Sequence, residues 1–231
     1  MGSQQLTGQV RELRGRGCSP KQIARILGLP PATVAPVVRA VAAEERTDES
    51  EPAPAGFWVS PGWSRGLVIE GHRQWRDVDE PGGGASGLVT VVAARERGGS
   101  KVAVCGYLVD VYCLGVKNAF GPSSMDRRKL PAFIGQFFGA YDTPPLAAPA
   151  ELARDLVFGA VEYARALGFE PAPDFGACAG HLGPWAGPSA IGFGCDGKPL
   201  FIQGPHDNPA PILSTLRRSV GQDNFHFLVV G

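Results

Sequence analysis

The residues best suited to chemistry lie in two short stretches of the C-terminal part of the chain. Asp110, Cys113 and Lys117 lie close together in the sequence, and His206 and Asp207 follow much later. Asp110 stands inside an apolar run, where a carboxylate is costly unless a partner stabilises its charge. It can pair with a buried arginine or with backbone amides, can ligate a metal, or can act as an acid or base. The sequence leaves these interpretations open.

Cys113 is a candidate nucleophile, because a thiol near an ammonium group such as that of Lys117 can have a lowered pKa. No histidine lies near it in the sequence, and cysteine is commonly a small core residue. His206 precedes a helix that we expect to begin at Pro209, where it can present a neutral imidazole or belong to a capping loop. An enzyme hypothesis therefore has four catalytic candidates: Asp110, Cys113, Lys117 and His206.

Two other motifs fall short of a metal or nucleotide site. Cys178 and His181 form a single Cys-x-x-His, which is half of a zinc site. Residues 192–197 match the pattern G-x-G-x-x-G, but their surroundings predict a strand, an Asp-Gly turn and another strand. A dinucleotide-binding loop must instead open a helix. We therefore expect no metal and no cofactor.

Basic side chains gather at the N-terminal end. Through Ala43 the sequence has six basic residues and the single acid Glu12, although 22 Lys and Arg balance 22 Asp and Glu over the whole chain. A local basic unit on a neutral chain is typical of a nucleic-acid contact, although a basic patch can also be only a solvated surface. The candidate DNA-contacting residues are Arg11, Arg14, Arg16, Lys21, Arg25, Thr33 and Arg39.

Residues 19–42 predict two of the helices that carry these side chains. A helix can begin at Pro20, capped by the preceding serine, and Gly28 can take the positive φ of a tight turn. A second helix follows from Pro31, and residues 4–14 predict a further helix before both. The apolar side chains of the helix after Pro31 recur at three- and four-residue steps: Val34, Val37, Val38 and Val41.

This pattern resembles the helix-turn-helix of resolvase-like and homeodomain-like DNA-binding proteins. The resemblance implies that the solvent side of the helix after Pro31 meets base edges, and there only Thr33 and Arg39 can form hydrogen bonds. Because a bidentate base contact supplies about 1–3 kcal/mol of discrimination, this helix can distinguish few sequences. Pro36 also removes a helical hydrogen bond. We expect binding that is driven by phosphates and weakens steeply with salt.

The rest of the chain predicts a second, larger domain. Residues 44–56 contain no large apolar side chain and predict a flexible linker. Residues 88–94 and 102–114 predict an antiparallel strand hairpin, and residues 150–167 an amphipathic helix. The expected fold is α+β, with a mostly antiparallel sheet in the larger domain. The expected division is a three-helix helix-turn-helix domain at 1–43, a linker at 44–56 and an α+β domain at 57–231.

The larger domain also resembles a family of uncharacterised bacterial proteins. The resemblance lies in the segments GYLVDVYCLGVKNAF, GAVEYARALGFEPAPDF and DGKPLFIQGPHDN, and it covers most of the chain from Phe57 onward. It implies no activity and no functional residue.

Function and location follow as expectations. The five cysteines are odd in number, no apolar N-terminal run could export the chain, and no stretch is long enough to span a membrane. We expect a cytoplasmic, regulator-like protein that binds double-stranded DNA, while its larger domain forms a homo-oligomer or senses a small-molecule or protein effector. The alternatives are an enzyme of unknown reaction and a helical hairpin that binds protein in place of DNA.

Overall fold

The computed structural model describes residues 3–15, 18, 20–31, 33–38, 41, 52–77 and 87–229. The chain divides into two compact units, Met1–Pro52 and Ala53–Gly231. We call them the N-terminal unit and the body, and we describe each by itself.

The N-terminal unit is helical. Helix α1 spans Ser3–Gly15 and helix α2 spans Pro20–Leu27, and residues 31, 33–38 and 41 are helical as well. Three of the four valines predicted from helical spacing after Pro31 are buried in its core, and Val37 packs partly buried against them. The buried members of the core are Val10, Leu13, Ile23, Ala24, Val34, Val38 and Val41. The predicted serine cap before α2, Ser19, lies outside the described residues.

The turn after α2 is fixed by its backbone. Gly28 has a φ of +63°, a left-handed conformation that glycine adopts without steric cost. The amide of Leu29 donates to the carbonyl of Ala24 at 3.1 Å, and the amide of Gly28 donates to that of Arg25 at 3.3 Å, which together are the two bonds of a Schellman motif. Pro30 then accepts from the amide of Val34, so the next helix starts at once.

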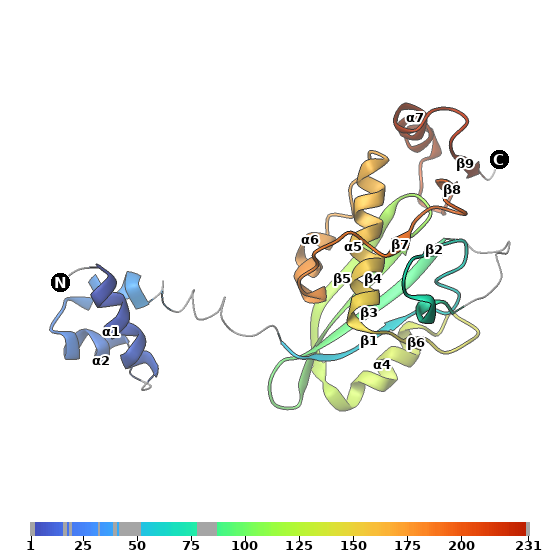
Figure 1. Cartoon of the computed structure of the whole chain (residues 1–231). Coiled ribbons are helices and arrows are strands. Elements are labelled where there is room, and N and C mark those ends of the chain that lie inside the picture. The colour runs from blue at the N-terminus through green and yellow to red at the C-terminus, as the bar shows by residue number, and fades with distance from the viewer. Residues whose placement is uncertain are drawn as a thin grey trace. The chain divides into compact units, whose positions relative to one another are not determined.

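The body is built on an antiparallel five-stranded sheet with the order β5-β4-β3-β1-β6 (Figure 1). This confirms an α+β fold with a mostly antiparallel sheet. The strands are β1 Pro54–Val59, β3 Leu88–Glu96, β4 Lys101–Asp110, β5 Gly115–Asp126 and β6 Leu146–Ala147.

The predicted hairpin is confirmed, because β3 and β4 pair antiparallel from Leu88 opposite Asp110 to Glu96 opposite Val102. Two boundaries were wrong. The strand predicted to reach Leu114 ends at Asp110, because the chain turns there into β5. The predicted linker reaches too far, because its last residues belong to β1 and pair with β3 from Pro54 onward.

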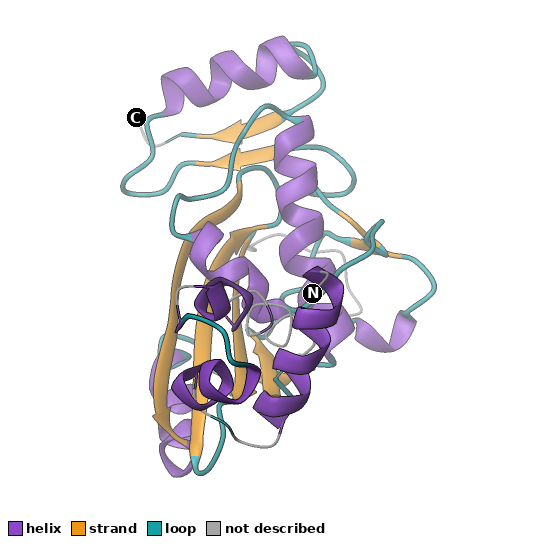
Figure 2. Cartoon of the chain, turned by 90° about the vertical axis from the view of Figure 1, so that its left-hand side faces the viewer, coloured by secondary structure: helices purple, strands orange, loops and turns teal. Residues whose placement is uncertain are grey.

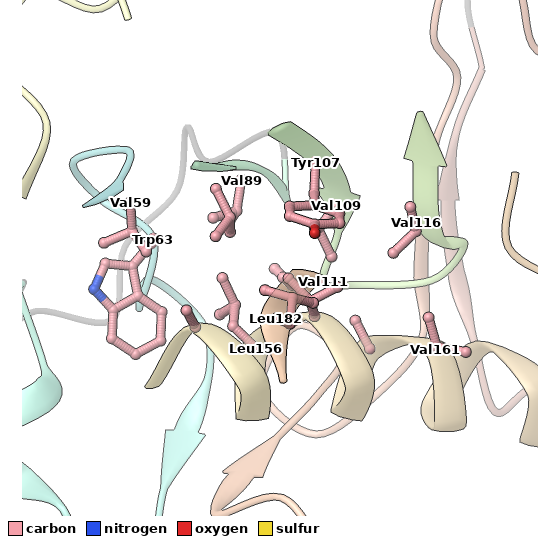
Figure 3. Packing of buried hydrophobic residues seen from close by; sticks show 14 of the residues in the cluster. Val59, Trp63, Val89, Tyr107, Val109, Val111, Val116, Leu156, Val161 and Leu182 are labelled. Carbon is pink, nitrogen blue, oxygen red and sulfur yellow. The ribbon is translucent and has the colours of Figure 1, made fainter. Parts of the chain in front are cut away.

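Helices cover both faces of the sheet. Helix α5, Ala150–Ala166, confirms the predicted amphipathic helix and packs on one face, and α4, Leu130–Phe137, packs on the other (Figures 1 and 2). In Figure 3, Leu156 and Val161 of α5 face Val109 of β4, Val116 of β5 and Val111 in the turn between these strands. The main core is therefore the layer between α5 and the sheet.

The remaining elements of the body lie outside the five-stranded sheet. Short strands β2, Val68–Ile69, and β7, Ile191–Gly192, pair antiparallel. Strands β8, Leu200–Ile202, and β9, His226–Leu228, pair parallel, and α7, Pro209–Ser219, connects them. Helix α6 spans Phe175–Cys178, and the 3-10 helices are η1 Arg73–Trp75, η2 Arg127–Lys129 and η3 Ala179–Leu182.

The glycine-rich motif at 192–197 opens no helix. Asp196 and Gly197 have φ values of 50° and 82°, and Cys195 pairs antiparallel with Lys198 across them. This is the predicted Asp-Gly turn, and it offers no helix N-terminus to a pyrophosphate. Among the described residues, no helix has the length and apolar character needed to cross a membrane.

Candidate functional site

The predicted DNA-contacting side chains that the structure describes all reach solvent. They are Arg11 on α1, Lys21 and Arg25 on α2, and Thr33 in the helical residues after Pro31. The side chains of Arg14, Arg16 and Arg39 lie outside the described residues.

Helix α2 positions its two cations together. Ile23 and Ala24 are buried in the core of the unit, which turns Lys21 and Arg25 to solvent one helical turn apart. Like charges at this spacing repel by about 0.2–0.5 kcal/mol, so the pair does not stabilise the helix. It does present two positive groups to an anion. Thr33 follows in the sequence after the turn at Gly28, and its side chain is also exposed.

In the body, the carboxyl of Asp110 pairs with backbone amides, which is one of the roles that the sequence left open for it. Its Oδ1 accepts hydrogen bonds from the amides of Tyr112 and Cys113, both at 3.0 Å, and the residue is only 4% exposed. Burial raises the pKa of Asp110 to about 6, against the opposing effects of these amides and of the Lys117 charge. The carboxyl therefore ties the turn between β4 and β5.

Of the two interpretations of Cys113, a nucleophile or a small core residue, the structure supports the core residue. Cys113 is fully buried in a cluster with Phe201 and Leu216. Burial raises the pKa of its thiol far above the ordinary value, the neighbouring Asp110 raises it further, and Lys117 only partly opposes them. A thiol of this kind stays protonated and is not a nucleophile at neutral pH.

Lys117 is directed at Asp207 by an irregularity in β5. Leu108 pairs with Asn118 and Val109 pairs with Val116, so Lys117 is an extra residue in the ladder, a β-bulge that re-aims its side chain. Its Nζ lies 2.6 Å from Asp207 Oδ2, which also accepts from the Gly204 amide at 2.8 Å. Burial acts to raise the pKa of Asp207, but the bonds from Lys117 and Gly204 outweigh it and lower the pKa.

His206 precedes Asp207, and its charge contributes to the lowered pKa of that carboxyl. The side chain of His206 is exposed, in the loop before α7, and Asn208 caps that helix by accepting from the amide of Ala210. The predicted catalytic residues thus separate into a buried carboxyl, a buried thiol, an ion pair and an exposed imidazole. Three cavities described in the body have other linings; one of about 240 Å³ is lined by Phe120, Phe137 and their neighbours.

The half zinc site is not completed. Cys178 Sγ donates to the Gly121 carbonyl at 3.3 Å, and His181 Nε2 lies 3.0 Å from the Ala103 carbonyl, to which it donates. Within the described residues, no group of three or more His, Cys, Asp or Glu side chains could hold a metal ion.

Sequence patterns did not single out two charged groups, the buried Arg95 and the half-buried Asp155. Arg95 on β3 is 3% exposed and donates to the carbonyls of His181 and Leu182 at the end of η3. Asp155 on α5 accepts from the Trp185 indole at 2.8 Å and from the Ala190 amide at 2.7 Å. Arg95 therefore holds η3 against the sheet, and Asp155 holds the loop that contains Trp185 and Ala190 against α5. Arg95 interrupts an otherwise apolar strand, and this was the available signal.

Comparison with known proteins adds no relative. No family model, no curated protein and no solved structure matches the chain.

Proposed function

We propose that the protein binds double-stranded DNA through its N-terminal unit, in the manner of a transcription regulator. The observation that supports this most is the exposed pair Lys21 and Arg25 on α2, in a small helical unit with Arg11 also exposed. Positive side chains held on one helix attract phosphates, and each phosphate that is neutralised releases counterions.

The proposed binding has little base specificity. Beyond the turn at Gly28, the exposed residues include Pro31, Thr33 and Pro36, of which only Thr33 carries a side-chain hydrogen-bonding group. Sequence is read by hydrogen bonds and apolar contacts to base edges, whereas phosphate contacts position the protein. The body then supplies oligomerisation or the binding of an effector.

The test is binding of the full chain to a labelled 30-bp duplex of mixed sequence, measured by fluorescence anisotropy between about 50 and 200 mM salt, the range over which phosphate contacts are lost. The double variant Lys21→Gln/Arg25→Gln should lower the slope of log K against log salt by up to about 2 and weaken binding about tenfold or more at low salt.

The matched control is Arg73→Gln/Arg76→Gln, which removes the same charge from two exposed arginines of the body. It should leave affinity within about twofold of the wild type, since these arginines do not belong to the proposed DNA-binding unit. Affinity that does not respond to salt, or that survives the loss of Lys21 and Arg25, contradicts the proposal.

A further inference from the structure

One end of the sheet gathers positive charge on the surface of the body. The turn from β3 to β4 and the 3-10 helix η2 meet there, because the Arg127 amide donates to the Ser100 carbonyl at 2.7 Å and Lys101 pairs with Asp126. We call this surface the basic rim. Its cations are Arg97, Lys101, Arg127, Arg128 and Lys129, all with exposed side chains.

The carboxylates at the basic rim neutralise only part of this charge. Glu96 pairs with Arg127 at 2.5 Å, and Asp126 pairs with Arg128 at 3.1 Å. Even so, the guanidinium side chains of Arg127 and Arg128 stay 60% and 88% exposed.

The other three cations of the basic rim, Arg97, Lys101 and Lys129, form no ion pair with a carboxylate in the described part of the chain. The excess is local, since residues 53–231 as a whole have fifteen Lys and Arg and sixteen Asp and Glu.

The surface around the basic rim suits a phosphate ligand. The hairpin tip has Gly98 and Gly99 with φ values of 80° and 59°, so no side chain covers the backbone there. Two serines with exposed side chains lie on this surface. Ser100 directly precedes Lys101, and Ser124 pairs with Ala103 in the β4–β5 ladder. Hydroxyls, backbone amides and cations are the groups that proteins use on phosphate oxygens.

The basic rim also lies where the N-terminal unit is attached. Pro54 pairs with Arg95, and the Glu96 amide donates to the Ala53 carbonyl at 2.8 Å, so the chain enters the sheet at this end. Figure 1 shows the first residues of β1, the turn between β3 and β4 and the start of α4 at the same end of the sheet. Covalent geometry limits the span from Val41 to Pro52 to about 40 Å.

We infer that the basic rim is a second phosphate-binding surface, which contacts the same DNA duplex as the N-terminal unit. The inference rests on the proposed function. A short tether makes the second contact intramolecular, so two weak phosphate surfaces together bind more tightly than either alone.

The test uses the full-length triple variant Arg97→Gln/Lys101→Gln/Lys129→Gln, which breaks no ion pair described above. On the 30-bp duplex of mixed sequence it should lower the slope of log K against log salt by up to about 2.7, and weaken binding about tenfold or more at 50 mM salt. Unchanged thermal unfolding of the variant verifies that the body is intact. The control Arg73→Gln/Arg76→Gln/Lys198→Gln removes equal charge from exposed sites elsewhere and should bind like the wild type.

The outcomes separate the two proposals. If the rim variant binds like the wild type while Lys21→Gln/Arg25→Gln loses affinity, the basic rim is only a solvated surface and the inference is overturned, but the proposed function stands. If both triple variants lose affinity equally, the effect is one of net charge and the inference is again overturned. If the wild type itself shows no salt-dependent binding to the duplex, the proposed function fails first.

Discussion

Asp110 shows how a residue that suggests chemistry can serve the backbone instead. It ends β4, and its Oδ1 accepts from the amides two and three residues ahead. Asp side chains commonly bond to the backbone ahead in this way and so fix a turn. Because the site is buried, ionisation is disfavoured although the amides stabilise the charge, and the pKa of Asp110 is raised to about 6.

The substitution Asp110→Asn keeps the acceptor and removes the titration. The unfolded chain ionises Asp110 near its ordinary pKa of 3.8, whereas the folded chain does so only near 6. The contribution of Asp110 to stability is therefore full below pH 4 and is lost as the pH rises through 6, by up to about 3 kcal/mol. Relative to the wild type, the Asn variant should gain free energy of unfolding at pH 7.5 and not at pH 4, measured by urea titration.

The control for this prediction is Asp110→Ala, which removes the acceptor. It leaves the amides of Tyr112 and Cys113 without that partner, at a cost of about 1–3 kcal/mol, so it should gain less than the Asn variant at pH 7.5. The decisive quantity is the difference in free energy of unfolding between Asp110→Asn and the wild type. If this difference is the same at pH 4 and pH 7.5, the carboxyl does not titrate as described.

At the scale of elements, β5 is the strand that departs most from regular pairing. Its register shifts twice against β4, between Val104 and Gly106 and between Leu108 and Val109. The second shift directs Lys117 toward Asp207 in the loop before α7, and so links the sheet to the β8-α7-β9 segment. The strand also begins close to α5, because Gly115 lies against Ala160 and Ala164.

The substitution Gly115→Ala tests this close approach. Gly115 has a φ of +68°, and a Cβ atom there would lie 2.9 Å from the Ala160 carbonyl oxygen and 2.8 Å from the Ala164 Cβ. Backbone strain and displacement of α5 together should cost about 3 kcal/mol or more in thermal or urea unfolding. The control Gly99→Ala has a φ of +59° and no atom near its Cβ, so strain alone, about 1 kcal/mol, should appear. Equal losses for both variants would mean that α5 does not pack tightly on Gly115.

The sequence predicted the elements whose signals are local. The β3–β4 hairpin has a β-branched, apolar run on each side of a Gly-Gly turn, and α5 repeats apolar residues at helical spacing, so both were predicted. Strand β5 was missed, because it starts directly after the turn at Asp110 and its second half, GPSSMD, is polar and contains a proline. The sequence could not decide between a nucleophile and a core residue at Cys113, because a lysine nearby in the sequence says nothing about burial by Phe201, which lies far along the chain.

For the molecule as a whole, each described hydrophobic cluster contains residues of one unit alone. The cluster around Val10, Ile23 and Val34 contains only residues of the N-terminal unit, and the three clusters of the body contain only residues from Ala55 onward. A unit of about 50 residues buries a smaller share of its surface than a body more than three times as long, so it has less stability to lose. Each unit should therefore unfold on its own.

The substitution Val34→Ala tests this independence in the full chain. Val34 is 1% exposed, so truncating it leaves a cavity and should cost about 2 kcal/mol, a large part of the stability of so small a unit. Hydrogen exchange followed by mass spectrometry should show lost protection in peptides of α1 and α2 and none lost in β3 and β4, and DNA affinity should fall with it. The reciprocal control is Val109→Ala, buried in the main core of the body, which should lower protection in the sheet and leave α1 and α2 unchanged. If Val34→Ala also exposes β3 and β4, the units unfold together, and a DNA contact at one of them would then be felt in the fold of the other.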